Sequence, residues 1–204
     1  MHYEVPYPPS GASFFSSAAS DLLCLPNDPE LHKPIPTKQL LNKKLRWMTL
    51  GGQYDWTRKV YPDGPPPPFP EDIAALVKGL FPMKAEAAIV NLYSPGDKLS
   101  LHRDVSEECD QPLASISIGC DGVFVIGLDP EEEGKKNRYA VVRLRSGDAV
   151  LMSGESRYAW HGVPQVLGDS CPEWMRNWPG EQFADWEGWM SGKRINLNVR
   201  QMFD

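Results

Sequence analysis

From residue 86 onward the chain consists of short segments that are either apolar or alternate between apolar and polar positions, which is typical of β-strands. Turn residues such as Pro95-Gly96, Gly119 and Gly147-Asp148 separate most of these segments. The predicted strands are 87–93, 99–104, 113–118, 122–128, 138–144, 149–152, 158–163 and 194–202. Many short strands at this spacing predict a mainly β fold, a sandwich or jelly roll.

The first part of the chain lacks this rhythm. Residues 1–36 are rich in Pro and Ser and predict an arm that wraps around the domain, with a short helix at 18–23. Residues 38–46 predict a turn or helix that leads into a strand at 47–50. Gly51-Gly52 then predicts a turn into a second short strand at 53–56.

Three further segments interrupt or precede the strands. The prolines between Tyr61 and Pro70 predict an extended connector at the surface, because proline cannot occupy a helix or sheet interior. Residues 71–80 begin with two acids and carry an apolar stripe at helical spacing, which predicts a helix. Residues 168–191 form a tryptophan-rich insertion, expected to be either functional or a hydrophobic cap over one edge of the sandwich.

The composition is that of an ordinary globular protein, with 204 residues, 41% hydrophobic and 24% charged. No apolar run approaches the roughly 18 residues of a membrane span, and the first residues lack a signal-peptide pattern, so we expect no membrane association. Cys24, Cys109, Cys120 and Cys171 form no Cys-x-x-Cys pair, which fits a reducing compartment. We expect an intracellular monomer in the nucleus or cytoplasm, with the mitochondrion as the alternative.

The charge distribution leaves two interpretations open. The net charge is −6, so the molecule as a whole does not resemble a nucleic-acid binder. Two basic clusters are nevertheless present: Lys38, Lys43, Lys44, Arg46, Arg58 and Lys59, and then Lys135, Lys136, Arg138, Arg143 and Arg145. They are either solvated loops or a basic face on an acidic body.

A possible metal site begins with His102 and Asp104, which stand two positions apart on a predicted strand and therefore face the same side. They supply two thirds of the two-histidine, one-carboxylate set of non-haem iron(II) oxygenases. Alone, such a pair is more often a chance feature of an exposed strand end. His161 is the third candidate, because His2 and His32 lie in the arm. In a jelly roll, we expect it at the opposite end of the same barrel mouth.

The last predicted strand places Arg194, Asn196, Asn198 and Arg200 on one face. Two arginines on a buried face require anions, and a dicarboxylate such as 2-oxoglutarate would supply them, because a guanidinium can hold a carboxylate through two hydrogen bonds. The alternative is an edge strand with an ordinary solvated face.

Three ordered motifs resemble the AlkB family of Fe(II)/2-oxoglutarate dioxygenases. They are Asn-x-Tyr-x-x-Gly-x-x-Leu-x-x-His-x-Asp at 91–104, Ser-Gly-x-Ser-Arg-x-x-x-His at 153–161 and Arg-x-Asn-x-x-x-Arg-Gln at 194–201. The similarity covers residues 40–203. The Leu-Arg-Trp sequence at 45–47 and the tryptophan-rich insertion resemble the subgroup of the first eukaryotic AlkB homologue.

The resemblance implies a double-stranded β-helix in one domain: an N-terminal arm at 1–36, a nucleotide-recognition lid and Pro-rich segment at 45–70, and the jelly-roll core at 86–203. It implies oxidation of a methyl group on a nucleobase with Fe(II), 2-oxoglutarate and dioxygen, and release of formaldehyde, succinate and CO2. The implied iron ligands are His102, Asp104 and His161. The implied 2-oxoglutarate residues are Asn91, Tyr93, Arg194, Asn196 and Arg200.

The family's recognition lid corresponds to residues 47–59, where Trp47, Met48, Tyr54 and Trp56 are expected near the base and Arg58 and Lys59 near phosphates. We expect at least one of the two tryptophans to be core.

One position departs from the family. Bacterial AlkB-type enzymes carry an acid two residues beyond the metal Asp, where this chain has Ser106. The departure favours neutral substrates, such as N6-methyladenine in DNA or modified bases in tRNA. The alternatives are the same chemistry on a protein or small molecule, since one fold hosts many substrates, and a non-enzymatic reader of nucleic acid.

Overall fold

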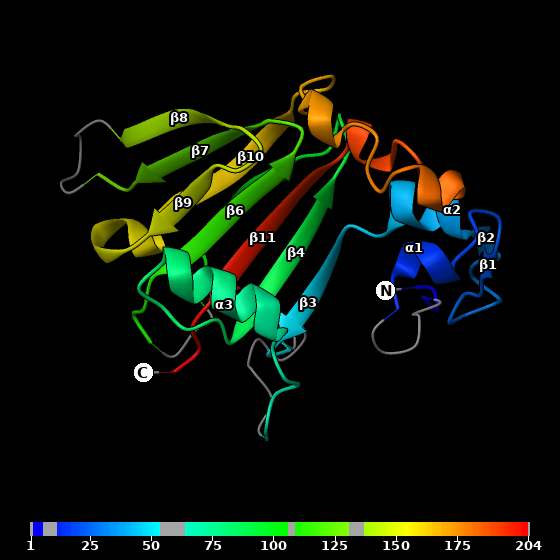
Figure 1. Cartoon of the computed structure of the whole chain (residues 1–204). Helices are drawn as coiled ribbons and strands as arrows, with labels where there is room; N and C mark the ends of the chain where they lie inside the picture. The colour runs from blue at the N-terminus through cyan, green and yellow to red at the C-terminus, as the bar shows by residue number, and fades with distance from the viewer. Residues whose placement is uncertain (1, 6–11, 54–63, 106–108, 131–136, 204) are drawn as a thin grey trace.

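Two antiparallel sheets face each other at the centre of the computed structural model, which describes residues 2–5, 12–53, 64–105, 109–130 and 137–203 (Figure 1). The larger sheet has the order β3(Trp47–Gly51), β4(Ala87–Tyr93), β11(Arg194–Arg200), β6(Leu113–Gly119), β9(Ala149–Met152). The smaller has the order β5(Leu99–His102), β10(Trp160–Val166), β7(Gly122–Leu128), β8(Arg138–Leu144). The predicted mainly β jelly roll is confirmed.

The predicted strands are present, with ends that differ by a few residues. The strand predicted at 99–104 ends at His102, and the strand predicted at 158–163 runs from Trp160 to Val166. The last strand, β11, lies between β4 and β6 and pairs with both along its whole length. The alternative that it is a solvated edge strand is therefore wrong.

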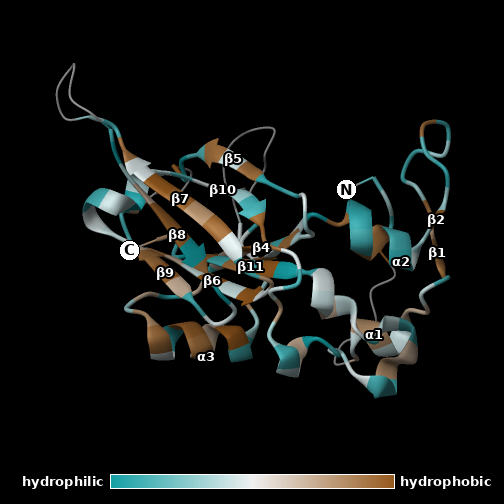
Figure 2. Cartoon of the chain, turned by 90° about the horizontal axis from the view of Figure 1, so that it is seen from above, coloured by the Kyte–Doolittle hydropathy of each residue, from teal (hydrophilic) through white to brown (hydrophobic). Residues whose placement is uncertain are grey.

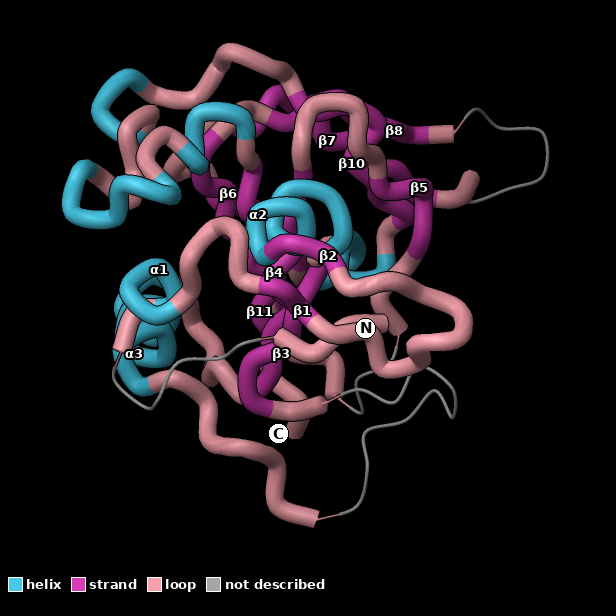
Figure 3. Tube along the Cα trace, turned by 90° about the vertical axis from the view of Figure 1, so that its right-hand side faces the viewer, coloured by secondary structure: helices cyan, strands magenta, loops and turns pink. Residues whose placement is uncertain are grey.

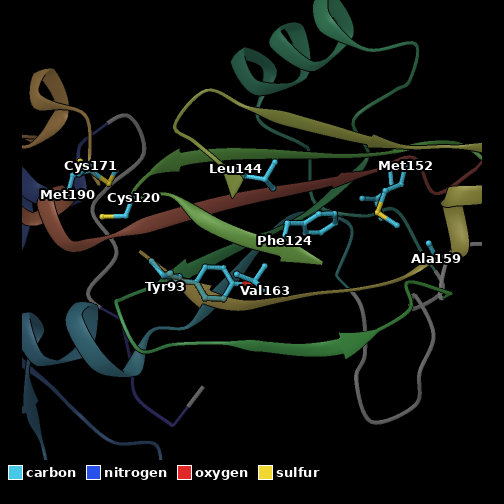
Figure 4. Packing of buried hydrophobic residues seen from close by; sticks show 11 residues of the cluster. Tyr93, Cys120, Phe124, Leu144, Met152, Ala159, Val163, Cys171 and Met190 are labelled. Carbon is cyan, nitrogen blue, oxygen red and sulfur yellow. The ribbon is translucent and has the colours of Figure 1, made fainter. Parts of the chain in front are cut away.

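The space between the sheets is filled by alternate residues of both. Phe124 and Val163 from the smaller sheet pack with Leu113 and Met152 from the larger one, and Figure 4 shows several of these side chains between the strands. Alternation sends every second side chain inward, so each strand contributes one face to this core.

The outer face of the larger sheet is covered by α3(Glu71–Leu80), which confirms the predicted helix (Figure 1). Its acids lie in the first turn, and its apolar residues appear brown in Figure 2. Val77 is fully buried against Ala88, Leu197 and Val199 of the sheet. Among the described residues, none of the helices is both long and apolar enough to cross a membrane.

The N-terminal arm packs beside the larger sheet, in front of β3 and β4 in Figure 3. Its elements are α1(Phe14–Ser17), β1(Leu23–Cys24) and β2(Ile35–Pro36), and α2(Thr37–Gln39) and the π-helix η1(Leu40–Lys44) follow it. The helix predicted at 18–23 is wrong. The Ser13 side chain caps an earlier helix, and Leu23–Cys24 pairs with Ile35–Pro36 with Cys24 inward. The second short strand predicted at 53–56 lies mostly outside the described residues.

The tryptophan-rich insertion folds as three 3₁₀ helices, η3(Glu173–Met175), η4(Glu181–Trp186) and η5(Trp189–Gly192), and a further one, η2(Gly154–Tyr158), precedes β10. Trp186 is 2% exposed and packs in one cluster with Leu40 and Leu92. Its indole nitrogen donates to the Ala18 carbonyl at 2.7 Å. This part of the insertion is the predicted hydrophobic cap, and it joins the arm to the sandwich.

Trp186→Ala is expected to lower the free energy of unfolding by about 3–5 kcal/mol, because it leaves a large cavity and an unpaired carbonyl. Trp174 of the same insertion is 77% exposed, so Trp174→Ala is the matched control and should change stability by less than about 0.5 kcal/mol. Urea unfolding followed by circular dichroism measures both. Equal effects of the two substitutions would contradict the role of Trp186 as a buried anchor.

Candidate metal centre

The structure brings His102, Asp104 and His161 together, with one potential ligand atom of each within 4.8 Å of the others. Nε2 of His102 lies 3.7 Å from Asp104 Oδ1, and Nε2 of His161 lies 3.9 Å from Oδ2. His161 on β10 is the direct register partner of His102 on β5. The expectation that His161 lies at the opposite end of the barrel mouth is therefore wrong. Adjacent antiparallel strands place the two imidazoles side by side.

Backbone carbonyls set the orientation of both imidazoles. Nδ1 of His102 lies 2.9 Å from the Ser100 carbonyl, and Nδ1 of His161 lies 3.0 Å from that of Ala159. A carbonyl can only accept, so Nδ1 of each ring carries a proton, and in the neutral ring the lone pair is on Nε2. Burial also lowers the pKa of His161, which favours the neutral ring. Both rings are thus prepared to bind a cation through Nε2.

The carboxylate of Asp104 is held by two donors from β11. Arg200 Nη2 donates to Oδ2 at 2.8 Å, and Asn198 Nδ2 donates to the same oxygen at 3.2 Å. Burial alone would raise the pKa of Asp104, but the charge and hydrogen bond of Arg200 outweigh it, so the pKa lies below its usual value. Asp104 is therefore an anion at neutral pH with one oxygen fixed in place.

The three residues open into a cavity of about 510 Å³, whose far end holds an unsatisfied positive charge. Arg194 is 1% exposed, and its Nη2 donates to Ser117 Oγ at 3.0 Å. Among the described residues, its Nε and Nη1 and the hydroxyl of neighbouring Tyr93 have no hydrogen-bond partner. A Cβ at Gly122 would lie 2.6 Å from Arg194 Nε. A buried cation with free donors is costly unless an anion binds there.

The cavity floor between these two ends is polar. Asn91 donates to Asn196 Oδ1 at 3.4 Å, and Asn196 donates to Ser115 Oγ at 2.7 Å. Both asparagines line the cavity, on neighbouring strands where they are register partners. The cavity therefore has one cationic end, an amide-lined floor and one end with the His–Asp–His set.

Comparison with known proteins agrees with this geometry. Residues 16–200 match the 2OG-Fe(II) oxygenase superfamily. The chain belongs to this superfamily. It is 51% identical to the N6-methyladenosine RNA demethylase ALKB1 of Pyricularia oryzae, over 99% of this chain and 64% of that protein. It is 49% identical to the N6-methyladenosine RNA demethylase ALKBH of Cryphonectria parasitica, over 100% of this chain and 99% of that protein. The chain thus spans less than two thirds of the first relative and nearly all of the second.

A solved structure gives the same family. The structure of OsALKBH1 aligns with a TM-score of 0.59 and 27% identity, over 76% of this chain and 77% of that chain. These relatives confirm the resemblance to the AlkB family and its eukaryotic homologues.

The residues present fit the superfamily's iron and 2-oxoglutarate. Two neutral imidazoles and one carboxylate are the donor set that non-haem Fe(II) prefers, and they leave coordination positions open. The unpartnered donors of Arg194 and Tyr93 match the acceptor oxygens of a carboxylate. Burial raises the pKa of Tyr93 to about 12, so its hydroxyl remains a donor.

Two polar residues of the site, Ser115 and Ser117, were not predicted, and Asn198 was placed on the polar face of the last strand without a role in the site. The signal was present, because Ser115 and Ser117 alternate on β6 and Asn198 belongs to the alternating polar face of β11. The Ser117 hydroxyl accepts from Arg194 and the Ser115 hydroxyl accepts from Asn196. These pairs depend on register between strands far apart in the sequence, and that register is visible only in the fold.

The predicted substrate residues divide into three groups. Trp47 lines the cavity and is 44% exposed, as expected for a residue near a bound base. The prediction that Met48 lies near the base is wrong. Met48 follows Trp47 on β3, so its side chain faces the other side of the sheet and packs against the cluster that contains Leu92. The remaining candidates, Tyr54, Trp56, Arg58, Lys59 and Ser106, lie outside the described residues.

The two basic clusters also differ. Arg138 lies 3.8 Å from Glu155 and Arg143 lies 2.7 Å from Asp121, so these members of the second cluster form ion pairs with local acids. Lys38, Lys43 and Arg46 of the first cluster line another cavity, which is described below.

Asn198→Ala is expected to weaken iron binding by about 10–100-fold, because it removes one of the two donors that fix Asp104. Titration of Fe(II) or Mn(II) against the anaerobic protein measures the affinity. Asn27→Ala, in the exposed part of the arm, is the control and should leave it unchanged. An unchanged metal affinity in Asn198→Ala would contradict the positioning role.

Proposed function

We propose that this enzyme removes methyl groups from bases in RNA, with N6-methyladenosine as the substrate to test first. The observation that carries the proposal is the combination of the His–Asp–His set with two relatives, about half identical, that are named N6-methyladenosine RNA demethylases. The exposed ring of Trp47 at the cavity supports it, because aromatic side chains stack on bases taken out of the helix.

In this proposal His102, Asp104 and His161 would hold iron through two imidazole nitrogens and a carboxylate oxygen. Arg194 and Tyr93 would hold the far carboxylate of 2-oxoglutarate, while Asn91, Asn196 and Arg200 would flank the near one. When bound, iron and 2-oxoglutarate supply the oxidation: one oxygen atom of O2 enters succinate as CO2 leaves, and the other is inserted into a methyl C–H bond. The hydroxymethyl group then leaves its nitrogen as formaldehyde.

The residues of the chain itself position the metal-binding carboxylate and exclude water from the cavity. Asp104 is fixed by Arg200 and Asn198, and Leu113, Phe124 and Val163 give the cavity apolar walls, which favour exclusion of water. An acid two residues beyond Asp104 would suit a cationic base, but the sequence has Ser106 there. The serine supports a neutral methylated adenine as substrate.

The test is turnover on matched oligonucleotides. The protein is incubated with Fe(II), 2-oxoglutarate and a 20-mer RNA that carries N6-methyladenosine, and formaldehyde and unmethylated adenosine are measured by mass spectrometry. The same sequence as DNA, a modified tRNA and a methylated peptide are the comparisons. Formaldehyde release from the peptide alone would overturn the proposal, and release from DNA or tRNA alone would move the substrate to that class.

We also propose that the enzyme acts as a monomer inside the cell. Every residue of the metal and cosubstrate ends comes from one chain, and the four cysteines are buried and free, which suits a reducing compartment. Light scattering tests the first statement and imaging of the tagged protein tests the second.

A further inference from the structure

A second cavity, of about 590 Å³, lies next to the Arg194 end of the active-site cavity described above. It lies between η1, the turn after β4 and the tryptophan-rich insertion, whose segments meet at the upper right of Figure 1. Consecutive residues divide the two spaces. Arg194 lines the active-site cavity and Lys193 lines this one, which we call the rear cavity.

The rear cavity is lined by four cationic side chains, Lys38, Lys43, Arg46 and Lys193, and by three acids, Asp97, Asp185 and Glu187. Lys193 is 7% exposed, and its ammonium donates to the Asn42 carbonyl at 3.0 Å and to Ser94 Oγ at 2.7 Å. An ammonium has three donors, so one is left over. Among the described residues, Lys38 and Lys43 on the rim form no ion pair, and the buried indole nitrogen of Trp189 has no partner.

The acids of the rear cavity are already engaged. Asp97 pairs with Arg46 and accepts from the Ser94 amide at 2.7 Å. Asp185 accepts from the Ser20 amide at 2.9 Å. Glu187 accepts from the Asn177 side chain at 2.8 Å. Each acid is thus held by a donor of the protein, and four cationic side chains face three acids, so the lining keeps an excess of positive charge. The matching ligand is one that carries only acceptors, such as a phosphate group.

The rear cavity is also placed where a nucleic-acid chain could continue. Arg46 lines it, and the next residue, Trp47, lines the active-site cavity. Because Arg46 and Trp47 are consecutive residues, a strand whose target base lies at Trp47 would have the rim of the rear cavity beside it.

We propose that the rear cavity binds backbone phosphates of the RNA strand that is being demethylated, with Lys38, Lys43 and Lys193 as the contacting cations. The inference rests on the proposed function for the identity of the strand. It adds a second contact region that determines how tightly long substrates bind without touching the reacting atoms.

The test compares Lys38→Gln/Lys43→Gln with the matched control Lys78→Gln/Lys84→Gln, which removes two exposed charges at and just beyond α3. Binding of an unmethylated 20-mer RNA is measured by fluorescence anisotropy at several salt concentrations. Each lost phosphate contact should reduce the slope of log affinity against log salt by about 0.7. Between 50 and 200 mM salt the affinity of the wild type should therefore fall by a factor about seven times larger than the factor by which the affinity of the rear-cavity variant falls. An unchanged slope, or an equal change in the control, would overturn the proposal.

Two further measurements separate this proposal from the proposed function. Acetylation footprinting with the same RNA should protect Lys38 and Lys43 but not Lys78 or Lys84, and this readout needs no turnover. Turnover of a methylated trinucleotide, too short to fill both cavities, should be equal in the wild type and both variants. Binding without any demethylation would refute only the function. Demethylation without protection would refute only the rear cavity's role.

A free nucleotide carries the same phosphate chemistry and is the other possible source. Adenosine monophosphate is therefore titrated as a competitor in the footprinting experiment. Protection of Lys38 and Lys43 by the mononucleotide, with none by the 20-mer, would overturn the assignment to RNA.

Discussion

Asp104→Ala is expected to abolish measurable succinate and formaldehyde production while leaving RNA affinity largely unchanged. The carboxylate is the anionic member of the proposed ligand set, and it lies between the two histidine nitrogens. Loss of a residue that merely orients a ligand costs about 10–100-fold, so loss of the ligand itself should exceed a hundredfold in kcat/KM. Coupled detection of succinate and formaldehyde measures the change, and RNA anisotropy measures the binding.

Folding must be separated from chemistry in this experiment, because Asp104 is also the buried counter-charge of Arg200. Asp104→Asn keeps the volume and one carbonyl oxygen, so it serves as a second variant with less disturbance of the fold. Asp72→Ala, in the exposed first turn of α3, is the control for a lost carboxylate. Wild-type turnover in both Asp104 variants would show that the metal centre has been wrongly assigned.

Arg194→Met is expected to weaken 2-oxoglutarate binding by at least about thirtyfold. Removing one partner of a buried charge pair costs about 2–5 kcal/mol, and each 1.4 kcal/mol is a factor of about ten. The effect of the substitution on stability should be different when no cosubstrate is bound. Since Arg194 is buried with unpartnered donors, an apolar side chain should leave the melting temperature of the cosubstrate-free protein unchanged or higher.

Calorimetric titration with 2-oxoglutarate and Mn(II) measures the affinity, and a thermal shift with and without 2-oxoglutarate measures the stability. Arg145→Met removes an exposed arginine from the turn after β8 and should leave both quantities unchanged. A large fall in the stability of the cosubstrate-free Arg194→Met protein, with normal 2-oxoglutarate affinity, would mean that the arginine supports the fold and does not bind the cosubstrate.

Much of the site could be predicted from local pattern. His102 and Asp104 lie two positions apart, and Arg194 to Arg200 alternate, so their common faces follow from the geometry of one strand. The helix at Glu71–Leu80 followed equally from its acids and apolar stripe. Met48 was misjudged because adjacent strand residues point to opposite faces, and the sequence did not show which face of β3 meets the cavity.

The sequence by itself determined the mainly β class, the His102–Asp104 pair and the alternating arginine face of the last strand, since each depends on residues near one another in the chain. It also named His161 as the third metal-binding candidate, because the chain has few histidines and the others lie in the arm. Only the tertiary structure decided that His161 lies directly opposite His102, that β11 is central in its sheet, and that Trp186 is a cap. It alone showed that Lys38, Lys43, Arg46 and Lys193 surround one cavity. These facts depend on pairing between segments far apart in sequence, where register and packing of the whole core select one arrangement.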